Sequence, residues 1–73
     1  MLFPKREIVE SLRLSFPKGT KVELVSMNDP YVIIPAGTHG VVTSVDDAGT
    51  IFVKWDTGNC LGAVYGVDSI KKV

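Results

Sequence analysis

The stretch from Gly37 to Gly58 reads GTHGVVTSVDDAGTIFVKWDTG. Two apolar segments in it are joined by DDAG at residues 46–49, and a second turn, DTGN, follows at residues 56–59. Asp and Gly are typical of tight turns, where the backbone often needs a positive φ. The pattern therefore predicts an antiparallel β-meander, around which we expect the rest of the chain to pack.

The second strand of this meander, residues 50–55, alternates between two faces. Ile51, Val53 and Trp55 share one face, and Phe52 and Lys54 share the other. We place the Trp55 face inward, which leaves Phe52 as an outward aromatic. Phe52 is then either covered by an N-terminal helix or exposed for stacking or partner contact.

Three further strands are expected outside this stretch, at residues 20–26, 60–64 and 69–73. Between the first strand and Gly37, Pro30 and Pro35 disfavour a regular strand. Residues 65–68 suit one turn of 3₁₀ helix before the last strand. The sequence thus predicts a mainly β fold, a small five-stranded SH3-like barrel with an N-terminal α-helix.

The N-terminal segment, residues 4–15, is predicted to be helical. Pro4 suits a first turn, Ile8 and Leu12 lie four residues apart on one face, and Phe16-Pro17 ends the segment. A helix of about three turns is marginal alone, so its apolar face must dock on the barrel or on a second copy. We expect one domain over residues 1–73, with the helix over 4–15 and the barrel over 19–73.

The composition limits the function. Eight basic and eight acidic residues give a net charge of zero, which argues against strong non-specific binding of nucleic acid. The single Cys60 excludes an internal disulfide and fits a reducing cytoplasm. It is interpreted as a buried strand cysteine, with a reactive thiol as the alternative. Because no apolar run is long enough for a membrane span or a signal peptide, we expect a cytoplasmic protein without membrane contact.

No catalytic or metal-binding group is predicted. Asp47 and Asp56 flank the strand at 50–55 and are separated by roughly 25 Å of extended chain. Asp29 and Asp56 could meet at one end of the meander, although turn roles explain these aspartates better. His39 is the single histidine, and with Cys60 it would supply too few ligands for structural zinc. We therefore expect a non-enzymatic protein with no metal and no cofactor.

The candidate contact surface for a protein partner is apolar and aromatic. The segment YVII at residues 31–34 either closes the core or presents a binding surface. In an SH3 domain, aromatics of the first loop and of the last turn grip a peptide, although Trp55 stands at the end of its strand instead of the beginning. The candidate residues are Tyr31, Val32, Ile33, Ile34, Phe52 and Tyr65.

Nucleic-acid binding is the alternative. Residues 1–21 contain five basic and two acidic side chains, a local charge of +3. These could form one basic face if the helix docks beside the first strand, with Phe52 or Tyr31 stacking on bases. The candidate residues are Lys5, Arg6, Arg13, Lys18 and Lys21.

Motifs along almost the whole chain resemble one family. They are PKGTKVEL at 17–24, MNDPY at 27–31, PAGTHG at 35–40, VDDAG at 45–49, VKWDTG at 53–58 and GVD at 66–68. Together they resemble the short bacterial family catalogued as domain of unknown function 4314. The resemblance implies a small stand-alone protein of bacteria, often carried by phages and other mobile elements, with no assigned activity.

Residues 37–58 are also similar, more loosely, to the core of KOW and Tudor-type SH3-like domains. There a Gly-x-x-Gly-x-Val strand precedes a Val-x-Trp-Asp-x-Gly strand, as it does here. Those relatives bind RNA, ribosome or polymerase surfaces, or modified peptides. We therefore expect an interaction module that binds a protein partner or self-associates, with a KOW-like nucleic-acid-binding accessory protein as the alternative.

Overall fold

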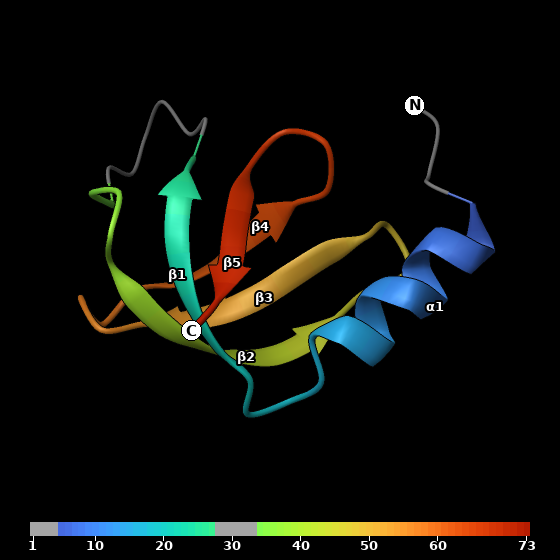
Figure 1. The fold of residues 1–73 in the computed structure, drawn as a ribbon, viewed down its shortest axis with the longest axis horizontal. Helices are drawn as coiled ribbons and strands as arrows, with labels where there is room; N and C mark the ends of the chain where they lie inside the picture. The colour runs from blue at the N-terminus through green and yellow to red at the C-terminus, as the bar shows by residue number, and fades with distance from the viewer. Residues whose placement is uncertain (1–4, 28–33) are drawn as a thin grey trace.

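The computed structural model describes residues 5–27 and 34–73, which form one helix and five strands in a single antiparallel sheet (Figure 1). The mainly β class is confirmed, the strands predicted at 50–55 and 60–64 have the predicted bounds, and the helix predicted at 4–15 and the strands predicted at 20–26 and 69–73 differ from the structure by one or two residues. The elements are α1 (Arg6–Ser15), β1 (Lys21–Ser26), β2 (His39–Val45), β3 (Thr50–Trp55), β4 (Cys60–Val64) and β5 (Ser69–Lys72).

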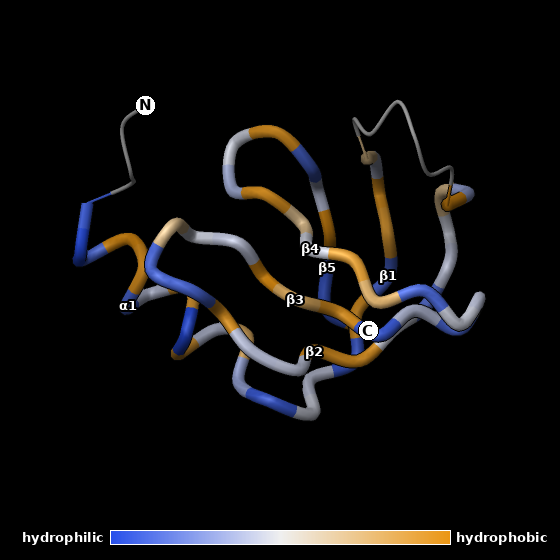
Figure 2. The backbone as a smooth tube through the Cα atoms, turned by 180° about the vertical axis from the view of Figure 1, so that it is seen from behind, coloured by the Kyte–Doolittle hydropathy of each residue, from blue (hydrophilic) through white to orange (hydrophobic). Residues whose placement is uncertain are grey.

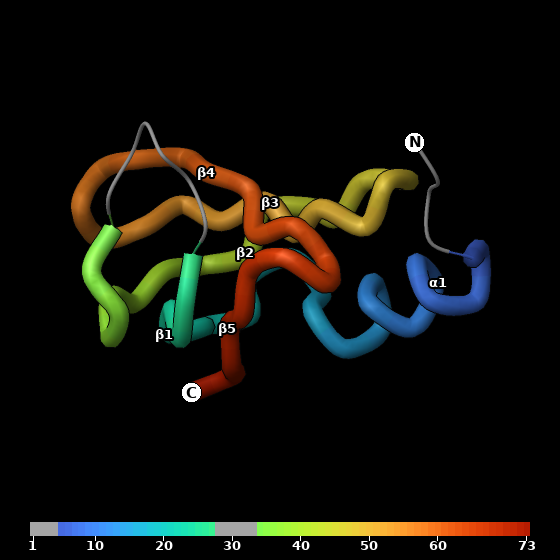
Figure 3. Tube along the Cα trace, turned by 90° about the horizontal axis from the view of Figure 1, so that it is seen from above, coloured from blue at the N-terminus to red at the C-terminus, as the bar shows by residue number. Residues whose placement is uncertain are grey.

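The strands follow the order β4-β3-β2-β1-β5 across the sheet. Register shifts interrupt the β2–β3 ladder between Val42 and Ser44 and the β1–β5 ladder between Leu24 and Ser26. Such bulges bend a strand and increase its twist. The sheet is accordingly curled, and β1 and β5 cross the direction of β3 and β4 (Figures 1 and 3).

The core fills the inner face of this curled sheet. Figure 2 shows hydrophobic segments in β1, β2, β3 and β4. Trp55 is 1% exposed, which confirms its predicted inward orientation. The buried cluster contains Val22, Leu24, Ile34, Val42, Ile51, Val53, Trp55 and Ala63.

Gly40 allows Trp55 to pack against the backbone of β2. The two residues are cross-strand partners. A Cβ atom at Gly40 would lie 2.9 Å from Trp55 Cε3 and 2.5 Å from Val53 Cγ1, closer than carbon atoms normally approach. The absence of a side chain at Gly40 is therefore what makes room for the largest side chain of the core.

The turn between β2 and β3 is held by Asp46. Its Oδ1 atom accepts hydrogen bonds from the backbone N–H groups of Ala48 (3.0 Å) and Thr50 (2.9 Å). Gly49 adopts a φ of +79°, which glycine reaches without a steric penalty. The predicted tight turn is confirmed, and the carboxylate of Asp46 is occupied by the backbone.

The connection from β4 to β5 is a hydrogen-bonded turn in place of the expected 3₁₀ helix. Val64 O accepts hydrogen bonds from the N–H groups of Val67 (3.0 Å) and Asp68 (2.9 Å). Gly66, within this turn, has a φ of +80°, whereas a right-handed 3₁₀ helix requires a negative φ. The prediction identified the turn but not its type.

The helix docks on the sheet of its own chain. Val9 is buried, and Leu12 and Phe16 pack against the core. Arg13 Nη2 donates to Asp47 Oδ1 at 2.7 Å, and Arg13 Nε donates to Val45 O at 3.2 Å. These contacts join α1 to the β2–β3 turn. Within the described part of the chain, no helix is long and apolar enough to cross a membrane.

We predict that Gly40→Ala lowers the free energy of unfolding by about 1–3 kcal/mol, because the new methyl group overlaps Val53 and Trp55. Chemical denaturation followed by Trp55 fluorescence measures the change. Val41→Ala, at the neighbouring and more exposed position of β2, is the control and should cost less. Equal losses for the two variants would contradict the packing role of Gly40.

Candidate functional site

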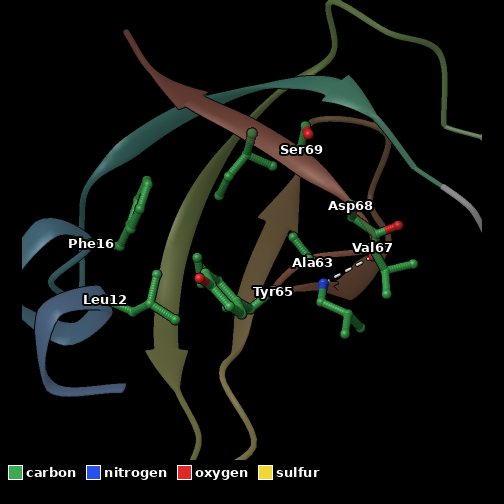
Figure 4. Close-up of a pocket in the computed structure, with 11 residues that line it drawn as sticks. Leu12, Phe16, Ala63, Tyr65, Val67, Asp68 and Ser69 are labelled. Carbon is green, nitrogen blue, oxygen red and sulfur yellow. Dashed lines mark hydrogen bonds between the residues drawn. The ribbon is translucent and has the colours of Figure 1, made fainter. Parts of the chain in front are cut away.

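An open apolar groove of about 330 Å³ lies between α1 and the turn that joins β4 to β5 (Figure 4). We call it the α1–turn groove. The helix supplies one wall, the inner faces of β3 and β4 supply the floor, and the turn with the start of β5 supplies the other wall. Its lining residues are Leu12, Phe16, Ile51, Ala63, Val64, Tyr65, Gly66, Val67, Asp68, Ser69 and Ile70.

The rim of the groove exposes three apolar or aromatic side chains at the end of β4 and in the turn after it. Val64 is 40% exposed, Tyr65 49% and Val67 53%. Asp68 Oδ2 accepts a hydrogen bond from the Val64 N–H at 2.9 Å, which the dashed line in Figure 4 marks. This bond ties the two ends of the turn together, so one of the few polar side chains of the lining holds the groove's shape.

Of the predicted partner-binding residues, the structure describes Ile34, Phe52 and Tyr65. Tyr31, Val32 and Ile33 lie outside the described residues. Ile34 is 6% exposed and belongs to the core cluster. At Ile34 the structure therefore favours closure of the core over a binding surface, because the side chain is not available to a partner.

Phe52 and Tyr65 are both accessible, but they do not form one surface. Phe52 is 39% exposed on the outer face of β3, while Ile51 on the inner face contributes to the groove. The Phe52 ring lies over Gly62 of β4, where an added Cβ would sit 3.4 Å from two ring carbons. Because α1 packs on the core side, the expected cover of Phe52 by the helix is wrong.

Sequence reasoning found Tyr65 but missed the residues around it. Val67 was assigned only to a helical turn, and Ile70 only to the last strand. Leu12 and Phe16 carried a usable signal, since their spacing of four residues places them on one helix face. Their meeting with the β4–β5 turn depends on tertiary packing, which no local pattern encodes.

Cys60 is exposed, so the interpretation as a buried strand cysteine is wrong. Side chains of a strand alternate between its faces, and Ala63 is buried while Leu61 packs partly against the core. Cys60 therefore falls on the solvent side of β4. Asp29 lies outside the described residues, so the structure does not test whether it lies near Asp56.

Two of the five predicted nucleic-acid-binding residues are engaged with acidic groups. Arg6 Nε lies 3.1 Å from Glu10 Oε1, and Arg13 Nη2 contacts Asp47. The other three come from the residue before α1, from the turn after it and from the start of β1: Lys5, Lys18 and Lys21, all exposed. The paired arginines have less positive charge to offer to a phosphate backbone.

A polar cluster lies on the outer face of β1, β2 and β5. Glu23 Oε1 is 3.1 Å from His39 Nε2, and Glu23 Oε2 is 3.4 Å from Lys71 Nζ. The hydrogen bond to His39 is the main cause that lowers the pKa of Glu23, and the charge of Lys71 adds to it. In residues 5–27 and 34–73, no three potential metal ligands come together.

We predict that Glu23→Gln makes stability less dependent on acid pH. A lowered pKa in the folded state means that Glu23 stabilises the protein above its ordinary pKa of 4.5, and that this stabilisation is lost as the pH falls through the folded value. Thermal unfolding between pH 7 and pH 3 should show a smaller fall in Tm for the variant. Glu7→Gln, on the exposed face of α1, is the charge-matched control. A fall as steep as that of the wild type would rule out this role of Glu23.

Comparison with known proteins identifies one family. No curated protein and no solved structure was found to match the chain significantly. A family model described as domain of unknown function (DUF4314) matches residues 5–73, which include α1 and all five strands. The suspected family is confirmed over nearly the whole sequence, and the chain belongs to the DUF4314 family, a domain of unknown function.

Proposed function

We propose that the protein is a non-enzymatic interaction module that binds a protein partner through the α1–turn groove. The observation that carries the proposal is the exposed apolar rim formed by Val64, Tyr65 and Val67 above a floor of core residues. Apolar surface that gathers in a concave site is typical of binding sites in soluble proteins.

The small size of the domain supports this interpretation. A chain of 73 residues has little apolar surface to spare, because small domains bury a smaller fraction of their surface. The exposed side chains of Val64, Tyr65 and Val67 do not contribute their full apolar surface to the core, so the domain forgoes part of the stabilisation that their burial would provide. Contact with a partner would remove the same side chains from water.

The place of the groove in the fold favours an extended polypeptide as the ligand. We infer that the curled sheet is an SH3-like barrel, on the basis of its strand order and of the long connection between β1 and β2. In such barrels the turn before the last strand supplies an aromatic side chain to a peptide groove. Tyr65 stands in that turn and lines the groove.

The exposed Cys60 bears on the compartment, and the ion pairs of the arginines bear on the alternative function. We propose the bacterial or phage-infected cytoplasm, because the lone thiol of Cys60 is exposed and suits a reducing compartment. The nucleic-acid alternative gains no support from the pairing of Arg6 and Arg13 with acids.

We predict that Val67→Asp abolishes capture of the protein partner, since it places an unpaired charge on the apolar rim. Val25→Asp is the matched control, because Val25 is 48% exposed on β1 and does not line the groove. Immobilised wild-type protein and both variants would be incubated with a lysate of the native bacterium, and captured proteins identified by mass spectrometry. Circular dichroism would verify that both variants are folded.

The expected result is a protein that the wild type and Val25→Asp capture and that Val67→Asp does not. Equal capture by the two variants would contradict a role for the groove. Captured material that disappears after nuclease treatment would replace the proposal with the nucleic-acid alternative.

A further inference from the structure

One edge of the sheet, β4, carries backbone groups for which the described residues offer no partner. In the β3–β4 ladder, Trp55 N–H donates to Asn59 O at 2.8 Å, and Tyr65 N–H donates to Gly49 O at 3.3 Å. These bonds mark the hydrogen-bonded pairs, which alternate with non-bonded pairs along an antiparallel ladder. It follows that the N–H and C=O groups of alternate β4 residues, Cys60, Gly62 and Val64, point away from β3.

The backbone N–H and C=O groups of Val64 are hydrogen-bonded within the turn that follows β4. Its N–H donates to Asp68, and its C=O accepts from Val67 and Asp68. Within the described residues no such partner faces the outward N–H and C=O groups of Cys60 and Gly62. The open edge therefore presents two donors and two acceptors, two residues apart.

Natural sheets normally protect such edges with charged side chains. The opposite edge, β5, has this protection in Lys71 and Lys72. The β4 sequence, CLGAV, contains no charged residue and no proline, and Cys60 is exposed. The difference between the two edges indicates that β4 is suited to pairing with another strand.

We propose that two copies of this chain associate through antiparallel pairing of their β4 edges about a two-fold axis at Leu61. Cys60 of each copy then lies opposite Gly62 of the other, and the two pairs exchange four backbone hydrogen bonds. The outward N–H and C=O groups of Cys60 and Gly62 in one copy meet the same groups of the second copy, so each of them gains a hydrogen-bond partner. This self-matching, together with the absence of charge in β4, favours a second copy over an unrelated strand.

The side chains next to β4 fit the same arrangement. Leu61, which is only partly buried, meets Leu61 of the second copy as a non-hydrogen-bonded pair, in which side chains approach most closely. On the outer face, the exposed Phe52 ring beside Gly62 reaches Cys60 of the second copy. The pairing thus covers Phe52, which the helix leaves exposed.

The interface is small, since it consists of one five-residue strand from each copy. We therefore expect a weak dimer in rapid exchange with the monomer. The dimer does not rest on the α1–turn groove, so Val67→Asp should leave it intact, and failure of one proposal does not imply failure of the other.

Cys60→Pro tests the pairing, with Cys60→Ser as the matched control. Proline at the first residue of an edge strand removes the outward N–H and is tolerated there, whereas serine keeps the N–H. Sedimentation velocity over a concentration series should show monomer–dimer exchange for the wild type and Cys60→Ser. Cys60→Pro should remain a monomer, with an unchanged circular dichroism spectrum.

A crosslink provides a second measurement that does not depend on the folding of the proline variant. In the double variant Cys60→Ser, Leu61→Cys, the two thiols face each other across the axis and should form a disulfide-linked dimer on mild oxidation. Cys60 alone, in the wild type, should crosslink less. A wild type that stays monomeric at millimolar concentration, a dimer that persists in folded Cys60→Pro, or no preferential crosslink at position 61 would each overturn the proposal.

Discussion

The packing of the Trp55 ring on the backbone of Gly40 positions the core residues of β3. It sets the alternation of β3, so that Ile51 faces the core and Phe52 faces outward. A shift of one residue would exchange the two faces of the strand and expose Trp55. The floor of the α1–turn groove and the outward position of Phe52 both follow from this orientation.

The elements that the sequence predicts well are those with local causes. Residues 50–55 show strict alternation, and Asp46 with Gly49 has the chemistry of a tight turn, so the meander follows from neighbouring residues alone. The type of the β4–β5 turn was missed because Gly66 adopts a positive φ that a helical reading of YGVD does not consider. The prediction for Cys60 was wrong because CLGAV contains no charged or strongly polar side chain that would mark which face of the strand meets solvent.

The candidate site was less predictable because its parts are distant in the sequence. Leu12 comes from the helix, Phe16 directly follows it, and Tyr65 and Val67 come from the last turn. The Arg13–Asp47 ion pair, exposed and individually weak, joins the helix to the β2–β3 turn. The open edge of β4 could not be predicted either. It depends on the strand order and on which β4 residues direct their backbone groups toward β3.

The docking of the helix on the core of its own chain is what forms one wall of the groove. An isotope-filtered NOE experiment on a mixture of labelled and unlabelled protein tests it most directly, because it separates contacts within one molecule from contacts between two. We predict intramolecular NOEs from the Leu12 and Phe16 side chains to the groove floor at Ile51 and Ala63. The same NOEs arising only between labelled and unlabelled molecules, or their absence, would contradict the account.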